Sequence, residues 1–185
     1  MTNDSRGRMV RSAASLIRSR GLSATSFSEV LAHSGAPRGS IYHHFPHGKQ
    51  QLAQEAIRWT SERALADLRA GAATTAMEVL ERFIDMWRQI VLTSGGTAGC
   101  VVAGVVIDSD AREAGKIELV RETFQSWIVM LADQLESAGV SSERATPIAV
   151  ATMAGMEGAL ILCRAEGNVR PLDIVGSELK RLLPQ

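Results

Sequence analysis

The feature that most constrains how this chain can fold is a helical spacing of apolar residues that recurs from end to end. Steps of three and four residues separate the apolar side chains over residues 10–17, 77–91 and 117–131. Side chains at this spacing share one face of a helix, and each helix is expected to bury that face against a neighbour. No stretch alternates strongly enough to indicate a β-strand. The pattern predicts an all-α chain of about nine helices.

Glycine, proline and short polar runs mark where these helices end. Gly21 is expected to stop the first helix, and the segment "RAGAATT" at 69–75 separates the fourth from the fifth. The eighth helix has two candidate starts, at Thr146-Pro147 or at Ser142. The expected helices lie around residues 10–20, 27–34, 37–45, 48–68, 77–92, 100–107, 117–138, 147–166 and 172–183.

Charge divides the chain into two unequal parts, although its formal net charge is +0. Residues 1–50 hold seven arginines and lysines against two acidic residues, which gives +5 and leaves −5 for the remainder. All four histidines also lie in this first part. We therefore predict a basic domain at 1–50, with a polyanion as its partner, and a helical domain at 51–185.

Within the basic part, two short helices are joined by a tight turn. Ser26 and Glu29 have the S-x-x-E spacing of a capping box, which starts the second helix. The turn at 35–36 follows, and Pro37 suits the first position of a third helix because its missing N–H is not needed there. Ile41 and Phe45 are expected to face inward. Two such helices with the first packed across them predict a helix-turn-helix, whose second helix enters the major groove of DNA.

The residues around the third helix suit contact with DNA. Arg38 can donate two parallel hydrogen bonds to guanine O6 and N7, Gly39 allows the backbone to approach the duplex, and Ser40 can reach a base edge. Phosphate oxygens can be bound by hydroxyl, imidazole and ammonium donors, which position a protein without reading sequence. The expected phosphate contacts are Thr25, Ser26, Tyr42, His43 and Lys49.

The stretch "GLSATSFSEVLAHSGAPRGSIYHHFPHGKQQL" resembles the DNA-binding segment of the TetR/AcrR family of bacterial repressors, over about residues 6–56. The segments "APRGSIYHHFPHGKQQLAQEAI" and, later in the chain, "GTAGCVVAGVV" are most similar to the LmrA/YxaF-like subgroup. Pro37 departs from the family, since many members have a serine cap there that binds phosphate, and "TAGC" stands where the subgroup often has "GCP". The resemblance implies a dimer of helical subunits that represses a gene for an efflux pump or an enzyme, and an apolar small-molecule effector whose binding in the second domain releases a pseudo-palindromic operator.

The resemblance, together with the positions of residues around each helix, implies two sets of functional residues in the second domain. The expected effector pocket consists of aromatic residues and of methionines, which repack around varied ligands: Met86, Trp87, Phe124, Trp127, Met130, Met153 and Met156. The expected dimer interface lies on the penultimate helix, where small residues allow close approach and apolar ones extend the surface: Ala151, Ala154, Gly155, Gly158, Ile161 and Leu162, with Leu160 beside them.

Other classes of function have little support in the sequence. His43 and His47 are four residues apart, but Pro46 between them breaks the helix that a metal-binding pair needs, and no metal or other cofactor is expected. No catalytic motif occurs, so an enzyme is not expected. The apolar run at 147–163 contains Glu157 and falls short of a bilayer span, which together with the charged N-terminus predicts a cytoplasmic protein. The alternative is a helical interaction protein that associates loosely with nucleic acid.

Overall fold

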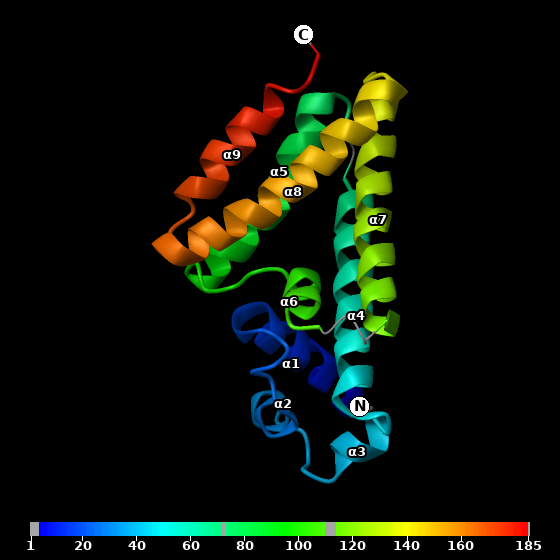
Figure 1. Cartoon of the computed structure of the whole chain (residues 1–185), viewed down its shortest axis with the longest axis vertical. Helices are drawn as coiled ribbons and strands as arrows, with labels where there is room; N and C mark the ends of the chain where they lie inside the picture. The colour runs from blue at the N-terminus through cyan, green and yellow to red at the C-terminus, as the bar shows by residue number, and fades with distance from the viewer. Residues whose placement is uncertain (1–3, 72, 110–113, 185) are drawn as a thin grey trace. The chain divides into compact units, whose positions relative to one another are not determined.

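The computed structural model describes residues 4–71, 73–109 and 114–184 (Figure 1). Over these residues it consists of α-helices joined by turns and loops, without strands, as the sequence predicted. Residue 72, within the predicted break at 69–75, lies outside the described part. The helices are α1 Ser5–Arg20, α2 Phe27–Ser34, α3 Ser40–His44, α4 Gly48–Arg69, α5 Ala76–Ser94, α6 Val101–Ile107, α7 Ala114–Ser137, α8 Ser142–Glu166 and α9 Arg170–Lys180.

Five helices have a boundary that differs from the prediction by three residues or more, and α1 and α7 begin earlier than expected, at Ser5 and Ala114. Helix α3 begins at Ser40 rather than at Pro37, because residues 37–39 form a turn in which the Ser40 N–H donates to the Pro37 carbonyl at 3.0 Å. Helix α8 takes the alternative start at Ser142 and carries Pro147 inside it. Helix α9 begins earlier than expected, with Pro171 in its first turn, and ends at Lys180.

The chain divides into two compact units. Unit 1 comprises Met1–Arg63 and Cys100–Thr123, and unit 2 comprises Ala64–Gly99 and Phe124–Gln185. Helices α4 and α7 each run from one unit into the other. The unit that contains the helix-turn-helix therefore also contains α6 and the first part of α7, whereas the division at residue 50 stays a prediction about function.

In unit 1, helices α2, α3 and α6 all pack against α1. Close packing of α6 on α1 occurs at Gly104, where an added Cβ would lie 3.3 Å from the Ile17 carbonyl oxygen. The core is formed by side chains that are at most 2 % exposed, among them Met9, Ile17, Val30, Ile41, Phe45, Leu52 and Ile57.

In unit 2, α5 and α9 pack against α8 and against each other. Ion pairs join Arg88 to Asp173 at 2.8 Å and Lys180 to Glu81 at 3.1 Å, and both connect α5 to α9. Most of the predicted inward stripe of α5 is buried, but Met77 is 43 % exposed because it lies in the first turn of the helix.

The C-terminal end of α4 is held by two side chains of unit 2. Arg82 of α5 donates to the carbonyls of Gly71 and, at 3.0 Å, Leu68. Gln134 of α7 donates to the same Leu68 carbonyl at 2.9 Å. These donors satisfy carbonyls that have no partner at the end of a helix.

Among the described residues, one helix is long and apolar enough to cross a membrane by length and composition, namely α8. This corrects the expectation that its apolar run falls short of a span, since the helix is continuous over Ser142–Glu166. Nine of its residues are buried and it packs on α5 and α9, as a core helix does.

Candidate nucleic-acid interface

Helices α2 and α3 form the predicted helix-turn-helix, with α1 in contact with both (Figure 1). Gly35 ends α2 in the left-handed conformation, with φ 64°, and the turn leads into α3. The side chains of Ile41 and Phe45 are 0 % exposed and fasten α3 to the rest of unit 1. Because both anchors lie on one side of this short helix, its opposite side is presented outward.

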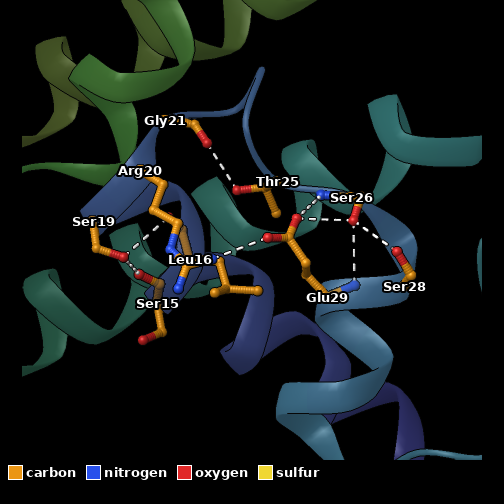
Figure 2. Close-up of polar contacts among 9 residues, drawn as sticks. All are labelled: Ser15, Leu16, Ser19, Arg20, Gly21, Thr25, Ser26, Ser28 and Glu29. Carbon is orange, nitrogen blue, oxygen red and sulfur yellow. Dashed lines mark hydrogen bonds and ion pairs between the residues drawn. The ribbon is translucent and has the colours of Figure 1, made fainter.

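The start of α2 is fixed by the predicted capping box, shown in Figure 2. The Ser26 N–H donates to the Glu29 carboxylate at 2.9 Å, and the Glu29 N–H donates to the Ser26 hydroxyl at 3.3 Å. Arg20 of α1 forms an ion pair with the same carboxylate at 3.0 Å. The backbone hydrogen bond from Ser26 is the main cause that lowers the pKa of Glu29, with the Ser26 side chain and Arg20 adding to it. The carboxylate thus joins α1 to the first turn of α2.

Thr25 does not have the exposure that a phosphate contact through its side chain needs. It is 3 % exposed, and its hydroxyl donates to the Gly21 carbonyl at 2.8 Å (Figure 2). Its side chain therefore stabilises the loop between α1 and α2. Ser26, next to it, is exposed, and its hydroxyl already takes part in the capping box.

The residues at the start of α3 are directed outward. Arg38 is exposed, and within the described part of the chain no hydrogen bond or ion pair engages its guanidinium. Gly39 has ordinary helical angles, φ −75° and ψ −14°, and a Cβ added there would meet nothing within 4 Å. Neither a positive φ nor close internal packing requires glycine at this position, and the absence of a side chain leaves the backbone at the start of α3 accessible from outside.

Other predicted DNA contacts are partly engaged within the protein. The Ser40 hydroxyl donates to the Pro37 carbonyl at 2.7 Å, which leaves its oxygen able to accept. Tyr42 is 70 % exposed and its ring meets Phe27 of α2 edge-on at 5.6 Å, while His43 is exposed beside it. Lys49 donates to the Ser23 carbonyl at 3.2 Å and keeps two of its three N–H donors for other partners.

Part of the positive charge of residues 1–50 is neutralised inside unit 1. Arg6 pairs with Glu55 at 2.7 Å and Arg11 with Asp4 at 3.5 Å, in addition to the Arg20 pair with Glu29. Arg18 is largely buried, and this desolvation lowers its pKa. The basic charge that the helix-turn-helix keeps for a partner is therefore carried mainly by Arg38 and Lys49.

The described side chains give no support for a metal site. Within the described ranges, no group of three or more His, Cys, Asp and Glu side chains lies close enough to hold an ion. His43 contacts His44 edge-on at 5.3 Å rather than facing His47 across a helix turn. Cys100 and Cys163 are both buried, and neither forms a disulfide.

Most of the residues predicted for an effector pocket belong to a buried cluster of unit 2. Trp87 and Trp127 are each 2 % exposed with ring centroids 6.2 Å apart, and Phe124 meets Trp127 at 5.9 Å. Met153 and Met156 are buried on α8, whereas Met86 and Met130 are half-buried. Sequence reasoning missed Phe83, which meets Trp87 at 6.3 Å, and the buried Thr152.

The residues predicted for a dimer interface separate into two groups. Ala154, Gly158, Ile161 and Leu162 are exposed, and Ile161 and Leu162 are 65 % and 50 % exposed. Ala151 and Gly155 are half-buried, and a Cβ at Gly155 would lie 3.0 Å from Leu179 of α9, so this glycine serves packing within unit 2. Leu160 is 2 % exposed and belongs to the core, contrary to the expectation that it extends the surface.

Comparison with known proteins agrees with this architecture. The family "Bacterial regulatory proteins, tetR family" matches residues 10–56, and "Transcriptional regulator LmrA/YxaF-like, C-terminal domain" matches residues 76–178. The uncharacterized HTH-type transcriptional regulator Rv0196 of Mycobacterium tuberculosis is 39% identical over 183 residues, which covers 96% of this chain and 93% of the relative.

Solved structures share the fold over nearly the whole chain. A TetR transcriptional regulator from Legionella pneumophila has a TM-score of 0.89 at 23% identity, and covers 100% of this chain and 99% of its own. A cysteine-substituted CifR, a TetR family regulator solved with 26-bp double-strand operator DNA, has a TM-score of 0.77 at 14% identity, over 97% and 96% of the two chains. With two family matches and a 39% identical relative, the chain belongs to the TetR family of DNA-binding, non-enzymatic transcriptional regulators, in its LmrA/YxaF-like branch.

Proposed function

We propose that this regulator is a cytoplasmic, dimeric repressor that binds a pseudo-palindromic operator and is released by an apolar small molecule. Two helix-turn-helix units would enter successive major grooves, about one helical turn of DNA or a little more apart. An effector that prefers the conformation with misplaced DNA-binding units would lower operator occupancy by at most its differential affinity for the two states.

The observation that carries the DNA-binding role is the outward, unengaged start of α3. Arg38 is exposed and has no hydrogen-bond or ion-pair partner among the described residues, and a Cβ at Gly39 would meet nothing within 4 Å. A guanidinium free to donate two hydrogen bonds beside a backbone that DNA can approach suits the reading of a guanine. We assign base reading to Arg38 and Ser40, with Gly39 providing access.

Phosphate contacts would position this helix on the duplex. Tyr42 and His43 lie exposed next to the base-reading residues, and Lys49 has spare donors at the beginning of α4. The exposed Ser26 can add a contact at the start of α2, where unpaired N–H groups favour an anion. Thr25 would support this site from inside, by holding the loop before α2.

Dimer formation is supported by an apolar face on α8 and α9 that unit 2 leaves uncovered. Ile161, Leu162 and Val150 of α8 are 65 %, 50 % and 46 % exposed, and Ile174 of α9 is 53 % exposed. Small residues at Ala154 and Gly158 leave room for a partner helix, since a Cβ at Gly158 meets nothing within 4 Å. Sedimentation at micromolar concentration tests this, because a monomeric wild type would refute the dimer, and Ile161→Glu is expected to dissociate it.

An effector site is supported by two buried polar atoms in unit 2. Trp87 Nε1 and Thr152 Oγ1 have no hydrogen-bond partner among the described residues, although the two residues are only 2 % and 0 % exposed. Such groups cost about 1–3 kcal/mol each when unsatisfied. A neutral aromatic molecule with a hydrogen-bond acceptor would contact the surrounding rings and methionines and accept from the indole N–H.

Fluorescence anisotropy tests the operator proposal. The purified protein is titrated onto duplexes tiled across the DNA beside its own gene, against random duplex, at two salt concentrations. A duplex bound at least ~10³-fold more tightly than random DNA is expected. Equal and steeply salt-dependent binding to every duplex, repeated with duplexes selected from a random library, would instead favour a helical interaction protein that binds nucleic acid loosely.

A further inference from the structure

One residue of the loop between α1 and α2 is held from two sides by distant parts of the chain. Asp108, which ends α6, accepts a hydrogen bond from the Ser23 N–H at 2.8 Å. Lys49 of α4 donates to the carbonyl of the same residue at 3.2 Å. The two partners are 85 and 26 positions away in the sequence. The backbone of Ser23 is thus fixed between a carboxylate from α6 and an ammonium from α4.

Two glycines allow α6 to come this close to α1. Gly21 ends α1 with φ 83°, and a Cβ there would lie 2.6 Å from Asp108 Oδ2. Gly104, one turn before Asp108 on α6, faces the Ile17 carbonyl, which an added Cβ would approach to 3.3 Å. A side chain at Gly21 would both strain the backbone and displace the carboxylate. The contact between Asp108 and the loop therefore depends on close packing as well as on a hydrogen bond.

The negative charge of Asp108 at the C-terminal end of α6 also indicates that this residue serves the α1–α2 loop. A carboxylate at the C-terminus of a helix lies next to its partially negative carbonyls and is disfavoured there. The side chain of Asp108 accepts its hydrogen bond from Ser23 in the α1–α2 loop, outside its own helix. The residue is better explained by what it does for the loop than by any benefit to α6.

A short series of contacts connects this loop to the outer face of α3. Thr25 closes the loop by donating to the Gly21 carbonyl at 2.8 Å, and Ser26 begins α2 directly after it. Phe27, the first residue of α2, packs edge-on against Tyr42 of α3 at 5.6 Å. A displacement of Ser23 would therefore change the start of α2 and the position of a proposed phosphate contact.

We propose that Asp108 is a positioning residue for operator binding, which fixes the α1–α2 loop through the Ser23 N–H and couples α6 to the helix-turn-helix. Helix α6 belongs to the segment that matches the C-terminal family domain, yet it packs within unit 1. A conformation of the protein that withdraws α6 would release the loop and lower operator affinity. This inference rests on the proposed function, since it concerns specific binding to DNA.

The test compares Asp108→Ala with Asp108→Asn, in the full-length protein. Asparagine keeps a side-chain oxygen that can accept from Ser23, whereas alanine does not. Asp133→Ala is the matched control, because Asp133 is exposed on α7 in unit 2. Hydrogen exchange of the Ser23 amide is followed by NMR, and anisotropy gives affinity for random duplex and for an operator that the wild type selects from a random library.

Asp108→Ala is expected to speed exchange of the Ser23 amide and to weaken operator binding roughly 10- to 150-fold, as loss of one charge-assisted hydrogen bond would. Binding to random duplex should stay within about twofold, since the basic side chains that neutralise phosphates are all retained. Asp108→Asn should recover most of the operator affinity, and Asp133→Ala should match the wild type in both measurements.

Faster exchange with unchanged operator affinity would overturn the proposal, because the contact would then be structural only. Equal losses for alanine and asparagine would overturn it too. If Asp108→Ala does not fold, Gly104→Ala acts on the same contact by pushing α6 away from Ile17, and unchanged operator affinity in that variant refutes the coupling. A wild type that selects no operator would refute the proposed function itself, and this inference with it, whereas Ser23 exchange would still report whether Asp108 holds the loop.

Discussion

Replacing Arg38 with alanine should separate base reading from every other contribution to DNA binding. The side chain is exposed and has no partner within the described chain, so its removal leaves no buried group unsatisfied. The melting temperature should therefore equal that of the wild type. A bidentate contact to guanine is worth about 1–3 kcal/mol. Because a dimer presents two copies, the operator complex should lose about 2–6 kcal/mol, or from about 30-fold to above 10⁴-fold in affinity.

The assay is competition anisotropy on the selected operator and on random duplex of equal length and salt. Arg170→Ala is the matched control, since Arg170 is an exposed arginine at the start of α9, in unit 2. It removes the same charge and should leave operator affinity within about twofold, because surface charges far from a contact are screened by salt. The assignment of Arg38 is refuted if the variant loses equal affinity for operator and random duplex, or if it loses less than about fivefold on the operator.

Three further predictions follow from the same unit. Gly39→Ala should leave thermal stability unchanged or slightly raised, since a Cβ there meets nothing within 4 Å, yet it should weaken operator binding; a fall in melting temperature would contradict this. Lys49→Ala should weaken binding to random duplex and reduce the slope of log affinity against log salt by about 1 per bound subunit, measured by anisotropy from 50 to 200 mM salt, and should cost additional affinity on the operator because Lys49 also holds the Ser23 carbonyl. The pKa of Glu29 is lowered in the folded state, so its contribution to stability is present above the unfolded pKa of about 4.3 and is lost as pH falls through the folded value; calorimetric unfolding between pH 6 and pH 3 should show less acid destabilisation in Glu29→Gln, and an unchanged pH profile would count against the lowered pKa.

Local signals in the sequence predicted most of the elements. The capping box of Ser26 and Glu29 is visible as a spacing, and the structure contains it. The same T-x-x-E spacing at Thr75 and Glu78 forms a second capping box, so the start of α5 could have been located more closely from the sequence. Pro37 misled the prediction of α3, because it is the first residue of the turn that precedes the helix and not the first residue of the helix itself.

Whether a residue on a helix is buried depends on which other elements pack against it. Site residues could therefore be predicted only in part from the sequence. Leu160 and Leu162 are both leucines of one apolar run, but they are 2 % and 50 % exposed, because only one of them faces the core of unit 2. Thr25 is a polar residue at the edge of a loop, yet its hydroxyl is bonded inside. Asp108 and Ser23 meet across 85 positions, and no local pattern in either segment indicates this contact.

The grouping of α6 with the helix-turn-helix limits how members of this family can exchange DNA specificity by recombination. A crossover near residue 56, where the N-terminal family match ends, would take Ser23 and Gly21 from one parent and Asp108 and Gly104 from the other. In such a chimera, the α1–α2 loop and the α6 residues that contact it would come from different parents. A functional graft would therefore need two segments, the first 63 residues and those from 100 to 123, transferred as a pair.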